Sequence, residues 1–169
     1  RAVEDLARRR FGVLAMSYDS FVTGHGKALA KDFLGRRRCL YVLDESTRIK
    51  TPSTIRTKTV LASSSHANHR RVLTGTPVAD GPFDVYAQMR FLDPTFWHGR
   101  GFAKFAAFKS HFGVYKKGYN GGREFPQLVA FRNVEKLAEM IAPISSRVTK
   151  AEALGLPPKL YSKHLFELD

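Results

Sequence analysis

The sequence of 169 residues predicts an α/β fold in which a partial parallel sheet is flanked by helices and followed by a helical C-terminal extension. Two observations support this fold class. In the first half, short apolar runs alternate with segments of helical periodicity, and the runs end at polar, acidic or glycine-containing residues. In the second half, apolar residues recur mainly at helical spacing. Because parallel sheets collect ligands at the carboxyl ends of their strands, the residues after each apolar run are the first candidates for a site.

Three apolar runs are predicted to be strands of this sheet. They span residues 11–16, 39–43 and 71–73, and they end at Ser17, at Asp44-Glu45 and at Thr74-Gly75-Thr76-Pro77, respectively. The first two are almost continuously apolar, which is typical of strands covered on both faces. Cys39 starts the second run, where we interpret it as a small buried hydrophobic residue, and a single cysteine fits a reducing compartment.

Five segments show the apolar periodicity of helices: residues 27–34, 53–63, 82–92, 102–112 and 133–142. Ser53 and Asn133 are predicted to cap the second and the last of these. The phenylalanine stripe within 102–112 resembles a base-stacking platform, but its spacing of three to four residues favours a helix face packed on the core. The glycine-rich, basic segment 116–126 is predicted to be a mobile surface loop, and residues 160–168 a last extended run.

The net charge of +13 favours a polyanionic partner, with nucleic acid as the first candidate. Residues 1–85 carry 15 basic and 8 acidic side chains, and residues 86–169 carry 13 and 7, so the excess is spread along the chain. A ribosome-associated or simply very basic enzyme is the alternative. The sequence contains no apolar run of membrane-spanning length and no signal peptide, so an intracellular location, cytoplasmic or nucleoid-associated, is expected.

The acidic pair Asp44-Glu45 has the composition that nucleotide hydrolysis requires. One carboxylate can hold Mg²⁺ through its water shell, and the other can polarise the attacking water. Taken alone, such a pair more often marks a solvated strand end. The Thr74-Gly75-Thr76-Pro77 segment strengthens the interpretation, because parallel strands would bring its hydroxyls towards the carboxylates, although an ordinary turn with Thr76 as a helix cap explains the tetrapeptide alone.

These motifs occur in the order and spacing of a known family. The segment LYVLDESTRIKTPSTIRTKTVLASSSHANHRRVLTGTPVADGPFDVYAQMRFLDP, residues 40–94, resembles the Swi/Snf-type helicase-like ATPases of helicase superfamily two, with motif II at Asp44-Glu45, motif III at 73–77 and a downstream Phe-Leu-Asp-Pro. Met16-Ser17-Tyr18 looks like motif Ib. The sequences at 144–150 and 156–159 look like the end of the family's first lobe, so the resemblance covers residues 11–169.

The resemblance implies a partial RecA-like (P-loop NTPase) sheet and assigns roles by position. Asp44 would coordinate Mg²⁺ through water, and Glu45 would orient the hydrolytic water. ATP hydrolysis would be coupled to DNA binding through Thr47, Thr74, Gly75 and Thr76. Family members often have histidine where this chain has Thr47, so the link from that position to motif III is in doubt. The expected nucleic-acid contacts are Ser17, Tyr18, Arg48, Lys50, Arg147 and Lys150.

The same resemblance divides the chain at residues 96 and 158. Residues 1–96 would form part of the ATP-binding lobe, 97–158 its helical extension, and 159–169 the start of a linker. Gly24-His25-Gly26-Lys27 fails as a phosphate-binding loop, because Phe21 replaces the first glycine and Ala28 the Mg²⁺-binding hydroxyl. We therefore expect the phosphate loop and a second RecA-like lobe to lie outside this chain, and the chain alone to be inactive.

The sequence thus predicts part of an ATP-dependent translocase on double-stranded DNA, using ATP and Mg²⁺, with no membrane partner. The compact motif II region favours a bacterial or phage source. The alternative is a degenerate, non-hydrolysing module that binds DNA or a protein partner.

Overall fold

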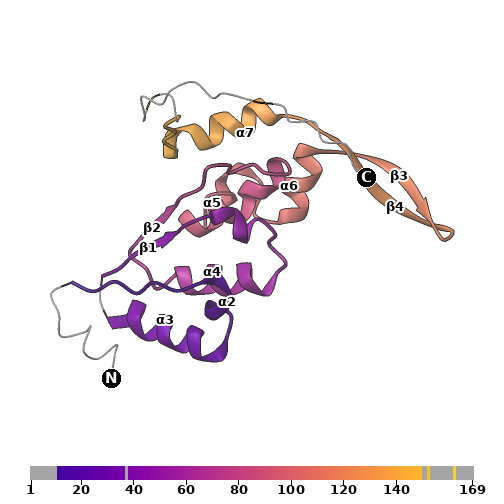
Figure 1. The fold of residues 1–169 in the computed structure, drawn as a ribbon. Coiled ribbons are helices and arrows are strands. Elements are labelled where there is room, and N and C mark those ends of the chain that lie inside the picture. The colour runs from indigo at the N-terminus through magenta and orange to yellow at the C-terminus, as the bar shows by residue number, and fades with distance from the viewer. Residues whose placement is uncertain (1–10, 37, 150–151, 153–161, 163–169) are drawn as a thin grey trace. The chain divides into compact units, whose positions relative to one another are not determined.

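The structure is a computed structural model that describes residues 11–36, 38–149, 152 and 162 (Figure 1). The chain divides into two compact units, Arg1–Val134 and Glu135–Asp169. No helix in these described residues is long and apolar enough to span a bilayer. The domain boundaries predicted at residues 96 and 158 rest on motif positions and stay a prediction.

The first unit contains the predicted parallel pairing. Strand β1 (Leu40–Leu43) pairs with β2 (His69–Val72) in parallel, in a register that places Leu43 opposite Val72. Helices α3 (Gly24–Arg36) and α4 (Ile55–Ser64) lie in the chain before β1 and between the two strands (Figure 1). The α/β class and two of the three predicted strands are therefore confirmed.

The core beneath this sheet is small. Its buried members come from β1 and from the surrounding helices: Phe21, Ala30, Leu43, Ile49, Val60 and Phe91. Leu40 and Val42 on β1 are 55% and 42% exposed, so the prediction that this strand is covered on both faces is wrong. The strand has one buried face. On this face the Tyr41 ring packs edge-on against the Phe91 ring, with 5.0 Å between the ring centroids.

The predicted first strand, residues 11–16, is not a strand. This segment has no regular secondary structure, and Phe11 and Val13 are 82% and 86% exposed. An apolar groove of about 690 Å³ is lined by this segment together with α3 and β1. The apolar run therefore lies beside β1 without joining its hydrogen-bonded ladder, and an apolar run without ladder pairing is not a strand.

Two short helices frame the motif II region. Ser17 caps α2 (Tyr18–Phe21) by accepting a hydrogen bond from the Ser20 amide at 3.1 Å. After β1, residues Ser46–Ile49 form the 3₁₀ helix η1. Helix α4 is capped by Thr54 and not by Ser53 as predicted, because the Thr54 side chain accepts from the Thr57 amide.

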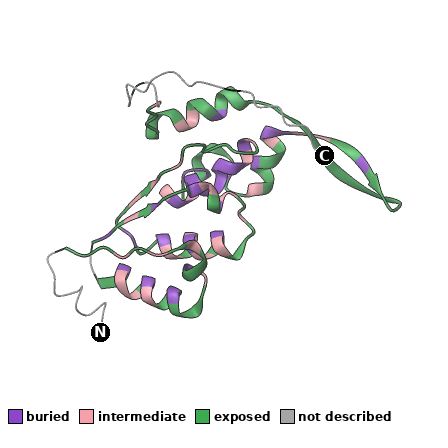
Figure 2. Cartoon of the chain, viewed as in Figure 1, coloured by how far each residue is buried: buried purple, intermediate pink, exposed green. Residues whose placement is uncertain are grey.

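An aromatic cluster fills the second half of the first unit. It is built by η2 (Pro82–Asp84), α5 (Val85–Leu92), η3 (His98–Arg100) and α6 (Phe105–Phe112). Trp97 is fully buried, and its indole Nε1 donates to the Tyr86 carbonyl at 2.9 Å. Phe108 and Phe112 are also fully buried, so the phenylalanine stripe is core, as predicted (Figure 2).

The segment predicted to be a loop is a β-hairpin. Strand β3 (Gly113–Asn120) follows α6 directly and pairs antiparallel with β4 (Arg123–Phe131), while Gly121 and Gly122 form the turn with φ of 54° and 79° (Figure 1). Every residue of β4 is exposed (Figure 2). The glycines and charges that suggested a loop belong to a hairpin turn and to solvent-facing strands.

The predicted amphipathic helix begins at the last residue of the first unit and continues into the second. Helix α7 (Val134–Ile141) is followed by the 3₁₀ helix η4 (Ala142–Ile144). Asn133 has left-handed backbone (φ 56°) and donates its side-chain amide to the His111 carbonyl at 3.0 Å, so it does not adopt the extended backbone usual for an N-cap. The predicted extended run at 160–168 lies outside the described residues, apart from Ser162.

Candidate functional site

The strand ends that carry motifs II and III are adjacent. The Leu73 amide donates to the Leu43 carbonyl at 2.8 Å, and the Ser46 amide donates back to the Leu73 carbonyl at 3.0 Å. These bonds continue the parallel ladder by one step beyond β1 and β2. Asp44-Glu45 and Thr74-Gly75-Thr76 therefore leave the sheet side by side at one edge, which is the geometry that the sequence predicted.

The acidic pair lies on a sharp, solvent-exposed turn. Glu45 adopts left-handed backbone with φ 48° and ψ 54°, a region that non-glycine residues rarely occupy. Its amide donates to the Asp44 carboxylate at 3.0 Å, which engages one carboxylate oxygen of Asp44. Strained backbone of this kind is concentrated at functional sites, because the surrounding structure must hold it in place.

Tyr18 is hydrogen-bonded to this turn. Its hydroxyl donates to the Asp44 carbonyl at 2.7 Å, linking the start of α2 to the end of β1. Burial, followed by the proximity of Tyr41 and Asp44, raises the pKa of Tyr18 to about 12. The sequence placed Tyr18 near nucleic acid and gave no indication of this contact with the acidic turn.

The motif III loop contains an internal hydrogen bond between a backbone amide and a side-chain hydroxyl. The Thr76 amide donates to the Thr74 hydroxyl at 3.2 Å. Thr74 is half-buried, whereas Gly75 and Thr76 are exposed. In the described part of the chain no hydrogen bond joins the carboxylates of Asp44 and Glu45 to the hydroxyls of Thr74 and Thr76, so the two motifs are neighbours that share backbone hydrogen bonds and no side-chain hydrogen bond.

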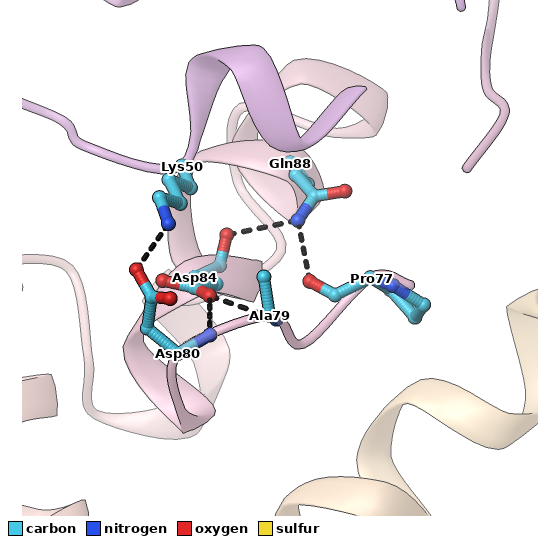
Figure 3. A network of polar contacts seen from close by, with 6 residues as sticks. All are labelled: Lys50, Pro77, Ala79, Asp80, Asp84 and Gln88. Carbon is cyan, nitrogen blue, oxygen red and sulfur yellow. Dashed lines mark hydrogen bonds and ion pairs between the residues drawn. The ribbon is translucent and has the colours of Figure 1, made fainter. Parts of the chain in front are cut away.

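A buried glutamine connects the two motifs instead. The Ser46 hydroxyl donates to Gln88 Oε1 at 2.6 Å. Gln88 Nε2 donates to the carbonyls of Pro77 and Asp84, both at 2.9 Å (Figure 3). Ser46 and Gln88 are 0% and 1% exposed. The residue directly after the acidic pair is thereby joined to the last residue of the Thr-Gly-Thr-Pro segment through one side chain of α5.

Asp84 and Lys50 fasten the loop that follows motif III. The Asp84 carboxylate accepts from the amides of Ala79 and Asp80 at 3.0 and 2.7 Å. Lys50, next to η1, forms an ion pair with Asp80 (Figure 3), and the hydrogen bond that its ammonium donates to the Asp80 carboxylate raises the pKa of Lys50. Lys50 was predicted to contact nucleic acid, but its ammonium is engaged within the protein here.

The end of the hairpin also reaches this loop. A β carbon built on Gly81 would collide with the Phe131 ring, so only glycine leaves room for the ring at this position. The Phe131 ring also packs edge-on against the Phe83 ring, with 5.3 Å between the ring centroids.

The other predicted site residues are scattered. Ser17 is occupied as the cap of α2, Arg48 is exposed on η1, and Arg147 is exposed in the second unit. Lys150 lies outside the described residues. Thr47 is half-buried on η1, but the link from motif II to motif III that was sought at Thr47 runs through its neighbour Ser46.

Comparison with known proteins shows the family of the chain. A family model described as "SNF2-related domain" matches residues 2–169. The chain belongs to this family. The resemblance to Swi/Snf-type helicase-like ATPases of superfamily two is thereby confirmed, while the roles of individual SNF2-related motif residues stay predictions.

A curated relative is the "Chromatin-remodeling ATPase INO80" of Arabidopsis thaliana, which is 35% identical over 85 residues. That match covers 50% of this chain and 5% of the length of the relative. No solved structure matches the chain.

Proposed function

We propose that this chain is the motif II and motif III part of a RecA-like lobe in a DNA-dependent ATPase. The observation that carries the proposal is the placement of Asp44-Glu45 and Thr74-Gly75-Thr76 at adjacent carboxyl ends of two hydrogen-bonded parallel strands. Phosphate-binding enzymes with parallel sheets bind nucleotides at this kind of edge. Membership of the SNF2-related family and the likeness to a remodelling ATPase support nucleotide hydrolysis as the chemistry.

The donor set suits Mg²⁺ bound through water. One Asp44 oxygen accepts from the Glu45 amide, which leaves the second to face the water shell of an ion. The described residues contain no group of three or more His, Cys, Asp or Glu side chains that could enclose a metal. Mg²⁺ commonly uses one or two carboxylates together with water and nucleotide phosphates. When bound, the ion would neutralise charge on the phosphates, and Glu45 would orient the attacking water.

The Ser46–Gln88–Pro77 connection is the proposed route between hydrolysis and the motif III loop. Ser46 follows Glu45 directly, so a shift of the acidic turn alters the position of its hydroxyl. Gln88 is bonded at both ends and fully buried, and it has no water available to replace a broken hydrogen bond. Movement at motif II would therefore displace Pro77 and the loop that Asp84 and Lys50 hold.

Double-stranded DNA is the proposed binding partner of the whole protein. The net charge of +13 provides the attraction to phosphates, and the SNF2-related family supports the assignment. Movement along the duplex, with ATP as the source of energy, is the activity proposed for the whole protein.

The test is Glu45→Gln in the complete protein. The substitution keeps the shape of the side chain and removes its charge, so DNA-stimulated ATP hydrolysis should fall by at least about a hundredfold, the range of a missing proton-transfer group. Binding of a fluorescent ATP analogue should be unchanged. Glu139→Gln, on exposed α7, removes the same charge and should leave turnover unaltered. Undiminished hydrolysis in Glu45→Gln would refute the assignment, and a parent protein without hydrolysis would favour a binding module.

A further inference from the structure

The hairpin β3–β4 has two faces of different chemistry. In an antiparallel pair, directly opposite residues point to the same side and successive pairs alternate. The register therefore separates the side chains between Tyr115 and Leu128 into two sets. One set, the neutral face, contains Tyr115, Lys117, Tyr119, Glu124, Pro126 and Leu128. The other, the basic face, contains Lys116, Gly118, Asn120, Arg123, Phe125 and Gln127.

Contacts within the hairpin agree with this division. On the neutral face, Lys117 forms an ion pair with Glu124 at 3.0 Å, and the Tyr119 hydroxyl donates to the same carboxylate at 3.0 Å. Glu124 is the hairpin's single acidic residue, so the charge on this face is cancelled.

The basic face has no such compensation. Lys116 and Arg123 are exposed, and in the described part of the chain neither forms an ion pair. Between them, Phe125 lies over Gly118, where a β carbon would come within 2.9 Å of the ring, and the ring remains 43% exposed. The amides of Asn120 and Gln127 complete the face. Ammonium, guanidinium, amide and aromatic groups together form a typical contact set for nucleic-acid backbones and bases.

The hairpin is fastened at its base. The Arg132 guanidinium donates to the carbonyls of His111 and Ser110 at 3.0 and 2.6 Å, and its amide donates to the Phe112 carbonyl at 2.9 Å. With the Phe131 and Phe83 rings in contact, these bonds tie the end of β4 to α6 and η2. Since an isolated two-stranded hairpin is marginal in water, this anchor is what keeps both faces in a fixed orientation.

We propose that the basic face of the hairpin, carrying Lys116, Arg123 and Phe125, binds the phosphodiester backbone of DNA. The choice of duplex DNA rests on the proposed function, whereas the phosphate-binding chemistry rests on the charge distribution of the hairpin itself. Lys116 and Arg123 neutralise phosphates, the two amides donate to phosphate or sugar oxygens, and Phe125 provides an apolar contact between the two cations.

Neighbouring lysines on opposite faces provide a matched pair of variants for the test. Lys116→Gln and Lys117→Gln remove the same charge from consecutive exposed positions of β3. In the complete protein, binding to a fluorescent 20-base-pair duplex would be titrated at several salt concentrations. Lys116→Gln should weaken binding about fivefold to tenfold near 0.1 M salt and reduce the slope of log K against log salt by about 0.9. The double variant Lys116→Gln/Arg123→Gln should reduce the slope by about twice as much.

Lys117→Gln should leave the slope unchanged, because Lys117 lies on the neutral face, which contacts no phosphate in this proposal. Equal losses in the two lysine variants would show nonspecific attraction and overturn the proposal, as would unchanged affinity in the double variant. The second result would leave the basic face to a different partner, such as an acidic protein segment. Failure here is separate from failure of the proposed ATPase, because Glu45→Gln is scored by hydrolysis and these variants by binding.

Discussion

The strand ends and the aromatic cluster belong to the same unit of the chain but are stabilised by different forces. Around Trp97, buried rings contact one another at centroid distances such as 4.8 Å to Phe108 and 4.7 Å to Phe96. At the strand ends, directional hydrogen bonds hold exposed loops. Helix α5 contributes to both regions, with Tyr86 in the cluster and Gln88 in the polar connection. Dense ring packing and fully paired buried hydrogen bonds both restrict movement, so α5 holds the aromatic cluster and the loops at the strand ends in one arrangement.

The largest expected loss of stability comes from a change in the aromatic cluster. Phe108→Ala would leave a cavity where the ring now contacts Trp97, Phe112 and Tyr86, and should lower the free energy of unfolding by about 3–5 kcal/mol. Urea unfolding monitored by tryptophan fluorescence would measure the loss. Phe105→Ala, at a half-buried position of the same helix, should cost clearly less. Similar losses in the two variants would contradict the view that the cluster is centred on Trp97.

The next largest effect is expected from a change in the Ser46–Gln88–Pro77 connection that leaves the aromatic cluster intact. Gln88→Leu would preserve bulk in α5 but leave the buried Ser46 hydroxyl without its acceptor, which should cost about 1–3 kcal/mol. In the complete protein, DNA-stimulated ATP turnover should fall by more than this loss of stability explains. Circular dichroism in urea and steady-state ATPase assays would measure the two quantities.

The double variant Ser46→Ala/Gln88→Leu is the control for that result. Removing the unpaired hydroxyl should recover part of the stability without recovering turnover, since the link to Pro77 stays absent. Full recovery of turnover would show that Gln88 serves only to satisfy Ser46 and does not couple the motifs.

The smallest effect concerns the tyrosine that fastens the acidic turn. The pKa of Tyr18 is about 12 in the folded chain against an ordinary value of 10.0. A raised pKa means that the stabilisation is fully present below pH 10 and is lost as the pH rises towards 12. In Tyr18→Phe, the free energy of unfolding should therefore decrease less steeply between pH 10 and pH 12 than in the unchanged protein. Unfolding midpoints at stepped alkaline pH, with tyrosinate absorbance recorded in parallel, would test it. An unchanged pH profile would argue against burial of the hydroxyl.

The sequence predicted secondary structure correctly where the spacing of apolar residues matches the residues that the fold buries. Strands β1 and β2, helices α3 to α7 and the packing role of Phe108 follow from apolar spacing. It failed for the hairpin, because two solvent-exposed faces rich in lysine, glycine and amides lack the apolar alternation by which strands are recognised. It failed for residues 11–16 for the opposite reason, since an apolar run does not reveal whether a partner strand is within bonding distance.

The candidate site was predictable only in its outline. The adjacency of the two strand ends that carry Asp44-Glu45 and Thr74-Gly75-Thr76 followed from the predicted parallel strands, whereas the expected approach of the hydroxyls to the carboxylates stays a prediction. The connecting residues Gln88 and Asp84 were not predicted, because a polar side chain inside a helical segment gives no indication of its partners until the fold is known. One signal was available in retrospect: Gln88 interrupts the apolar stretch of α5 between Ala87 and Met89, where an unpaired amide would be costly.

The close approach of Phe131 to Gly81 gives the hairpin a mechanical role. The ring fills the space beside the backbone of the loop that Asp84 and Lys50 clamp, and it is also the last residue of β4. Arg132 holds the same end of the hairpin to the Ser110 and His111 carbonyls of α6, so the base of the hairpin is attached both to α6 and to this loop. A force on the hairpin tip would therefore be carried to the loop that follows Thr74-Gly75-Thr76-Pro77 as well as to α6.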